Sequence, residues 1–142
     1  MIDHVWTVVC SHAVIDTDSQ NVSIHNVLEQ INLTAELTPD LVIDIPYQIV
    51  SFWVRSDIES PAKGKSRIVL ADPTGDTTVI AEMPIDLTQV ERARHRMYCR
   101  GLRLTSSGRY MFQVELLEEG GKEWRRIASV PLRVVVTSPL RD

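Results

Sequence analysis

Apolar residues recur at every second position along most of the chain, with polar residues between them. This period of two is typical of β-strands that are buried on one face. It predicts eight or nine strands, over residues 5–10, 22–35, 45–55, 67–71, 77–83, 95–105, 110–116 and 124–136. Many short strands without a long amphipathic helix indicate an all-β fold, and we predict a two-sheet antiparallel sandwich.

The alternation is irregular at four places. The parity of the apolar positions switches near Asn26 and near Gly101, which predicts a β-bulge at each. Pro131 cannot donate a backbone hydrogen bond, so the last strand is expected to lie at an edge or to switch sheets. Residues 85–92 follow neither a strand nor a helix period clearly and predict a short helix or an irregular crossover.

The chain has 142 residues, of which 44% are apolar and 24% are charged. These values are ordinary for one globular domain. We expect a single domain over residues 1–136 and a flexible tail over residues 137–142. No apolar run is long enough to span a bilayer, and the first residues lack the pattern of a secretory signal, so we expect a cytoplasmic protein.

The stretch from Leu104 to Phe112 has a distinctive spacing: Leu, three residues, Gly, one residue, Tyr, one residue, Phe. It resembles the tyrosine corner of immunoglobulin-like sandwiches, in which the tyrosine hydroxyl bonds backbone at the start of a strand. Tyr110 would take that role, and Trp53 resembles the buried tryptophan of the central strand. The resemblance implies an immunoglobulin-like sandwich, with C2-like and jelly-roll sandwiches as alternatives. The expected core includes Trp53, Tyr110, Phe112, Val114, Leu132 and Val134.

A second resemblance extends over nearly the whole chain. It is carried by Ala13-Val14-Ile15-Asp16, Asn21-Val22-Ser23-Ile24-His25-Asn26-Val27, Phe52-Trp53-Val54-Arg55, Gly108-Arg109-Tyr110-Met111-Phe112, and Trp124 before Val130-Pro131-Leu132. Together these motifs resemble a family of small uncharacterised bacterial proteins with a β-sandwich fold. This resemblance supports the fold and implies no activity.

The formal net charge of −4 opposes binding to nucleic acid or to an anionic membrane, and we expect neither partner. One basic stripe stands out against that charge, because Arg94, Arg96, Tyr98 and Arg100 would share one face of a strand. Such a stripe can follow a phosphate backbone. The alternative is a solvated strand face whose arginines pair with acids such as Glu115.

The sequence contains no nucleotide-binding glycine motif and no serine-nucleophile motif. Cys10 and Cys99 could in principle pair with one of the four histidines. Catalysis would then need a lowered thiol pKa and a third, orienting group, and the sequence indicates neither. We therefore expect buried, reduced thiols, no cofactor and no enzymatic activity.

Two acidic loops are candidates for a calcium site of the kind found in C2-like sandwiches. They contain Asp16 and Asp18 in one loop and Asp72 and Asp76 in the other. Calcium needs about six to eight oxygen ligands. The alternative, which we favour, is that these aspartates bond to the backbone of their own turns. No other metal-ligand spacing is present in the sequence.

The strand expected over residues 45–55 is apolar on both faces, whereas a two-layer sandwich buries only one face of each sheet. Val50, Phe52 and Val54 would form an exposed apolar patch that needs a cover. Residues 85–92 could cover it as a helix, or a second copy or another protein could do so. The sequence thus favours a non-catalytic interaction or structural module that binds itself or another protein; the alternative is a ligand- or calcium-binding sandwich.

Overall fold

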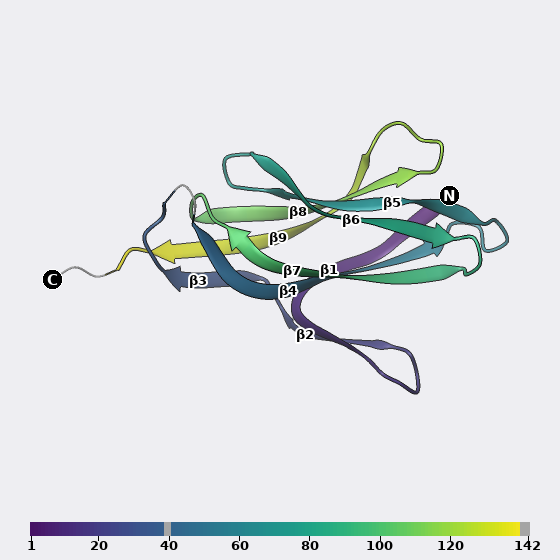
Figure 1. Cartoon of the computed structure of the whole chain (residues 1–142), viewed down its shortest axis with the longest axis horizontal. Helices are drawn as coiled ribbons and strands as arrows, with labels where there is room; N and C mark the ends of the chain where they lie inside the picture. Colours follow the sequence, from purple (N-terminus) through teal and green to yellow (C-terminus); the bar gives the residue numbers. More distant parts are fainter. Residues whose placement is uncertain (39–40, 140–142) are drawn as a thin grey trace.

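The computed structural model describes residues 1–38 and 41–139. These residues form nine strands: β1 (Ile2–Ile15), β2 (Val22–Val27), β3 (Gln30–Thr34), β4 (Val42–Arg55), β5 (Ala62–Ala71), β6 (Thr77–Leu87), β7 (Arg92–Arg103), β8 (Gly108–Glu118) and β9 (Arg125–Thr137). The first sheet has the order β2-β1-β4-β7 and the second, which is strongly curled, has the order β3-β9-β8-β5-β6 (Figure 1). The predicted all-β fold with two sheets is confirmed.

The expectation that both sheets are antiparallel is wrong at one pair of strands. β3 runs parallel to β9, with Ile31 paired to Val134, so the second sheet is mixed. The single strand expected over residues 22–35 is also wrong, because it breaks at Leu28 and Glu29. β2 stays in the first sheet and β3 joins the second, and this crossover accounts for the parity switch that the sequence shows. Asn26, where we expected a bulge, has a left-handed backbone conformation with φ 55°.

The main core lies between the two sheets. The six side chains expected there are all buried, with at most 1% of their surface exposed: Trp53, Tyr110, Phe112, Val114, Leu132 and Val134. Tyr47 joins them and packs edge-on against Phe112, with ring centroids 6.0 Å apart. Aromatic side chains each remove about 150–250 Å² of surface from water, so they contribute a large part of the burial that holds the sheets together.

The tyrosine corner is confirmed by its hydrogen bonds. The Tyr110 hydroxyl donates to the Ser106 carbonyl oxygen at 2.7 Å. It accepts from the backbone N–H groups of Thr105 at 3.1 Å and of Ser106 at 3.2 Å. Because the ring is fully buried, these bonds satisfy a hydroxyl and three backbone groups that would otherwise be costly to bury.

No helix forms in the described ranges, so the short helix considered for residues 85–92 is absent. β6 continues to Leu87 and a short bend leads directly into β7. The Arg55 guanidinium fixes this bend, because it donates to the carbonyl oxygens of Leu87 at 2.8 Å and Thr88 at 3.2 Å. A third bond, to the Ile58 carbonyl at 2.8 Å, ties the loop after β4 to the same side chain.

Two of the sequence irregularities have clear structural counterparts. Gly101 has φ +88°, and the register between β4 and β7 shifts opposite it, between Ile43 and Pro46. The predicted bulge is therefore confirmed. Pro131 is not on an edge strand, since β9 lies between β3 and β8. However, β3 pairs only with residues 133–137 of β9, so the missing N–H of Pro131 lies beyond that pairing.

The end of the chain differs slightly from the expected boundary. Thr137, assigned to the flexible tail, is the last residue of β9 and pairs with Thr34. Its carbonyl oxygen also accepts a hydrogen bond from the backbone N–H of Ala35 at 3.1 Å. The expected tail residues 140–142, and residues 39–40 of the loop before β4, lie outside the described residues.

Candidate functional site

The outer face of the first sheet, which is turned away from the second sheet, is covered in part by the β1–β2 hairpin. In Figure 1 this hairpin projects from the body of the molecule. Cys10, Ala13 and Val50 are buried beneath it in a small cluster separate from the main core. Two arginines of β7 hold the hairpin: Arg94 donates to the Gln20 carbonyl oxygen at 2.9 Å and Arg96 to the Ala13 carbonyl oxygen at 3.4 Å.

The hairpin covers one of the three predicted interface residues, Val50, and leaves Phe52 and Val54 accessible. Val50 is completely buried, so the chain's own hairpin covers it, and residues 85–92 take no part. Phe52 and Val54 remain half-buried on the same face. The apolar surface that remains accessible is therefore centred on Phe52.

A groove forms on this outer face, and we call it the aromatic groove. The strand registers place Trp6, Phe52 and Arg94 in one row across β1, β4 and β7. The rings of Trp6 and Phe52 stack, with centroids 5.7 Å apart and planes inclined by 21°. The hairpin tip forms the opposite wall and encloses a hollow of about 440 Å³. Its lining consists of Trp6, Ser19, Gln20, Asn21, Val22, Phe52, Arg92, Ala93 and Arg94.

A second hollow of about 280 Å³ lies next to the first, on the other side of Phe52, and we include it in the aromatic groove. Phe52 and Arg92 line both hollows. Ile58, with 60% of its surface exposed, lines the second hollow beside Val54. The aromatic groove thus offers a half-buried aromatic pair at one end and an exposed aliphatic side chain at the other.

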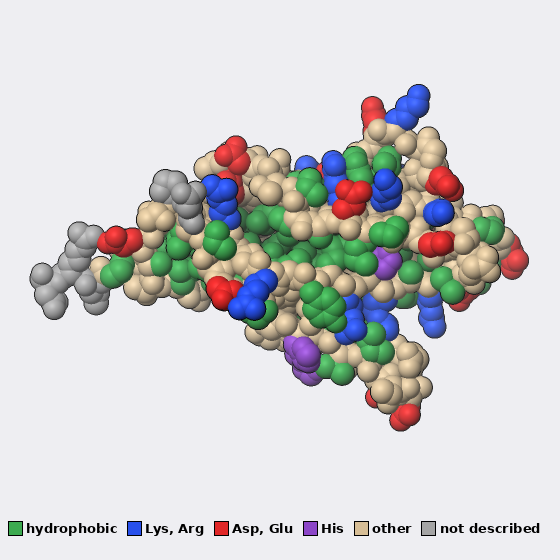
Figure 2. All heavy atoms as spheres, viewed as in Figure 1, with side chains coloured by type: hydrophobic (Ala, Val, Ile, Leu, Met, Phe, Trp, Pro, Cys, Tyr) green, Lys and Arg blue, Asp and Glu red, His purple; other side chains and the backbone are tan. Residues whose placement is uncertain are grey.

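The rim of the aromatic groove is mainly basic. The exposed Arg92 side chain makes no hydrogen bond or ion pair with any described residue, and Arg94 uses one N–H on the Gln20 carbonyl. Glu91 is the acidic residue of the lining and lies in the second hollow. Figure 2 shows blue Lys and Arg side chains gathered in the recess between the hairpin and the rest of the molecule.

The predicted basic stripe does share one face of β7, since its residues alternate along the strand and pair with outer-face positions of β4. Its charges are partly engaged. Arg96 lies 5.7 Å from the Tyr98 ring centroid, and Arg100 forms an ion pair with Asp44 at 2.7 Å. The expected pairing with Glu115 is wrong, because that carboxylate binds Arg67 at 2.7 Å in the second sheet.

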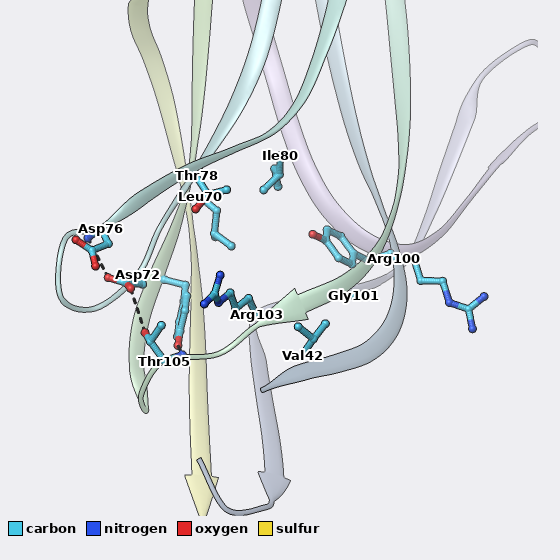
Figure 3. A pocket seen from close by; sticks show the side chains of 12 residues that line it. Val42, Leu70, Asp72, Asp76, Thr78, Ile80, Arg100, Gly101, Arg103 and Thr105 are labelled. Carbon is cyan, nitrogen blue, oxygen red and sulfur yellow. Dashed lines mark hydrogen bonds between the residues drawn. The ribbon is translucent and has the colours of Figure 1, made fainter. Parts of the chain in front are cut away.

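A second depression, the edge cleft, opens between the edge strands β6 and β7 and has a volume of about 430 Å³ (Figure 3). Its floor includes Tyr47, Leu70 and Tyr110 of the main core, and Figure 2 shows apolar surface along this open side. Arg100, which belongs to its lining, points away from it in Figure 3. The edge cleft is thus an incompletely closed edge of the sandwich.

Two of the four acidic candidates, Asp72 and Asp16, cap their own turns with their carboxylates. One oxygen of the Asp72 carboxylate accepts from the Thr74 hydroxyl at 2.6 Å and from the Asp76 N–H at 3.0 Å. Its other oxygen accepts from the Thr105 hydroxyl at 3.1 Å. The hydrogen bond from Thr74, with further donors, holds the pKa of Asp72 below its usual value. Asp16 likewise accepts from the backbone N–H groups of Asp18 and Ser19.

The two acidic loops do not come together. One joins β1 to β2 in the first sheet and the other joins β5 to β6 in the second. In residues 1–38 and 41–139, no group of three or more His, Cys, Asp or Glu side chains is arranged to hold a metal ion. The structure therefore favours the turn-capping interpretation for Asp16 and Asp72.

Neither cysteine is set up as a nucleophile. Both thiols are free; Cys10 is buried and Cys99 is half-buried. Burial raises the pKa of each thiol, and the hydrogen bonds to His12 and Tyr47 that oppose the rise are smaller effects. A nucleophilic thiol requires the opposite shift.

Two histidines lie on the inner face of the first sheet, which sequence reasoning did not detect. His4 packs edge-on against Trp53, with ring centroids 5.1 Å apart, and its Nε2 lies 2.7 Å from the Thr7 hydroxyl. His95 is paired with Ser51 across β4 and β7. Burial lowers the pKa of both imidazoles. Strand parity was an available signal for His95, which alternates with the buried Met97, whereas the register shift between His4 and Trp6 hides that signal for His4.

The fold and the two depressions place this chain among all-β proteins with two packed sheets. No family model matches the sequence, and no curated protein matches it. No helix in the described part of the chain is long and apolar enough to cross a membrane.

Three solved structures show weak similarity. The alkylpurine DNA glycosylase AlkC of Pseudomonas fluorescens, bound to DNA, is 14% identical, with a TM-score of 0.35 over 74% of this chain and 27% of that one. A family 123 glycoside hydrolase of Clostridium perfringens is 10% identical, with a TM-score of 0.37 over 96% of this chain and 28% of that one. The N-terminal domain of PorA is 13% identical, with a TM-score of 0.32 over 92% of this chain and 97% of that one. The chain thus spans less than a third of the two enzymes.

Proposed function

We propose that this chain is a non-catalytic, immunoglobulin-like interaction module that binds another protein through the aromatic groove. The observation that carries the proposal is the stacked Trp6–Phe52 pair, which lies half-buried beside Arg92 and Arg94 on a sheet face that the hairpin covers only in part. The tyrosine corner and the buried Trp53 support the immunoglobulin-like assignment.

The composition of the groove fits a protein interface. Aromatic side chains and arginine are enriched in interface cores, and tryptophan and arginine recur among the residues whose truncation costs most affinity. A hollow of about 440 Å³ is large enough to receive one or two anchor side chains. The half-buried state of Trp6 and Phe52 means that a partner would remove further apolar surface from water.

The charges around the groove define the partner. Arg92 and Arg94 flank the aromatic pair, and guanidinium groups bind carboxylates with paired hydrogen bonds. We infer a partner segment with an apolar or aromatic anchor followed by Asp or Glu. Nucleic acid is a poorer fit, because the chain carries a net charge of −4 and the arginines of the stripe are partly engaged.

The edge cleft supports a binding function less well. Its carboxylate Asp72 is already saturated by Thr74, Asp76 and Thr105, and its floor consists of residues that hold the sheets together. A ligand there would compete with the turn and corner that stabilise the fold. We therefore place the interaction surface on the aromatic groove.

A display selection with random peptides of about twelve residues tests this proposal. The wild-type chain is the bait, and the expected consensus combines an aromatic or aliphatic anchor with neighbouring acidic residues. Arg92→Glu reverses an exposed charge and should abolish binding of a selected peptide without loss of fold. Phe52→Ala should weaken the same peptide at least about tenfold, as expected for removal of an anchor contact.

Tyr98→Ala is the matched control, because Tyr98 is an aromatic residue of the same sheet face, 68% exposed, outside the groove lining. It should leave peptide binding unchanged. The proposal is overturned if selected peptides bind the Arg92→Glu and Phe52→Ala variants as well as wild type. It is also overturned if sedimentation shows a wild-type dimer that Phe52→Ala turns into a monomer, since the occupant would then be a second copy.

A further inference from the structure

A pair of histidines on the β1–β2 hairpin forms a separate feature outside the aromatic groove. His12 on β1 is the direct cross-strand partner of His25 on β2. The two rings are 6.0 Å apart between centroids and their planes are inclined by 31°. Both side chains are exposed, so the main core does not require either ring.

The ring nitrogens are available for a ligand. Neither imidazole forms a hydrogen bond or an ion pair with a side chain or backbone group in the described part of the chain. Neutral imidazole is the commonest metal ligand among protein side chains, and it suits zinc, copper and nickel.

The separation of the rings fits a shared ion. With metal–nitrogen bonds of about 2.0–2.1 Å and tetrahedral geometry, two imidazole centroids would lie roughly 5–5.5 Å apart. The observed 6.0 Å requires only a small rotation of exposed side chains. The backbone at His12 and His25 is held in register by the neighbouring cross-strand pairs. These are Cys10 with Val27 on one side and Ala13 with Ile24 on the other.

We propose that His12 and His25 together bind one divalent transition-metal ion of the zinc, nickel or copper class. No third protein ligand is arranged beside them in the described residues, so water would complete the coordination. An ion held this way would link β1 to β2 and brace the hairpin that covers Val50. The inference stands independently of the function proposed for the aromatic groove.

Calorimetric titration of the untagged 142-residue chain with zinc sulfate, and separately with nickel sulfate, tests the site. We expect one ion per chain and a rise in the melting temperature on adding metal, because the ligand binds only the paired, folded hairpin. His12→Gln and His25→Gln should each weaken binding at least about tenfold and remove the rise, since a single imidazole is a monodentate ligand and loses the gain from two linked donors. Calcium chloride should give no binding at this site, because calcium prefers oxygen ligands.

His95→Gln is the matched control, since this histidine lies on the inner face and away from the hairpin. It should bind the metal within about twofold of wild type. Circular dichroism verifies that each variant remains folded, which is expected at the exposed His12 and His25 and must be shown for the half-buried His95. Absence of binding by wild type at millimolar zinc and nickel, or unchanged affinity in either hairpin variant, overturns the proposal.

Discussion

β4, in the first sheet, is apolar on both faces, but the two faces are covered in different ways. On the inner face Tyr47, Ile49 and Trp53 pack against the second sheet and are buried. The outer face has only a narrow hairpin over it, which buries Val50 and leaves Phe52 half-exposed. A strand that is apolar on both sides therefore does not imply a missing subunit. The chain covers part of that surface itself, and the uncovered remainder is the aromatic groove.

The largest expected difference between the faces is in the adjacent residues Trp53 and Phe52. Trp53→Ala should lower the free energy of unfolding by about 3–5 kcal/mol, because it empties a site in the closed core. Phe52→Ala should cost roughly 1–2 kcal/mol, since the side chain already contacts water and leaves no closed cavity. Guanidinium chloride unfolding measures both. Equal losses would mean that the outer face is as closed as the inner one.

This comparison also shows what could be predicted from the sequence. The inner face follows from local alternation, and the tyrosine corner from a motif of nine residues, 104–112. Both signals are local, so a single sequence contains them. The burial of the six expected core residues confirms that this information was sufficient.

The arrangement of the outer face could not be predicted in the same way. The stacking of Trp6 on Phe52 and the bond from Arg94 to Gln20 join segments that are distant in the sequence. The break between β2 and β3 falls at Leu28 and Glu29, where there is no Gly or Pro to mark it. A hairpin that folds back over its own sheet leaves no periodic pattern. In the sequence, the only sign of the groove was that residues 45–55 are apolar on both faces of the strand.

A second, smaller effect tests the cover over the outer face. Val50→Ala should cost about 1–3 kcal/mol, because Val50 is enclosed with Cys10 and Ala13 beneath the hairpin. Val54→Ala is the matched control; it lies on the same face beyond the hairpin, and its loss should be about half as large or less. Urea unfolding of both variants gives the comparison. A larger loss for Val54 would show that the hairpin does not cover Val50 in solution.

A still smaller effect concerns the inner-face histidines. Burial lowers the pKa of His4 and His95 from the ordinary value of 6.5, so below about pH 6.5 the unfolded chain binds more protons than the folded chain. The free energy of unfolding should therefore decrease as the pH falls from about 6.5 through the lower pKa values of the folded state. The guanidinium midpoint should decrease between about pH 7.5 and 5.5, and less steeply in His95→Gln. A midpoint that rises over this interval would contradict the burial of these rings.

The smallest expected effect is no effect, and it concerns the loops beside the two depressions. Asp16 and Asp18 lie at the hairpin tip that walls the aromatic groove, whereas Asp72 and Asp76 line the turn beside the edge cleft. Asp16 and Asp72 each cap their own turn, and a carboxylate that accepts several local hydrogen bonds would have to give some of them up to coordinate calcium. Millimolar calcium chloride should therefore leave the melting temperature unchanged.

Any ion that binds only the folded chain must raise that temperature, so an increase would reveal a site. Asp16→Asn and Asp72→Asn would then assign the calcium site to one loop, because only the variant that removes a ligand would lose the rise in melting temperature. That loop would have a binding function in addition to the capping of its turn.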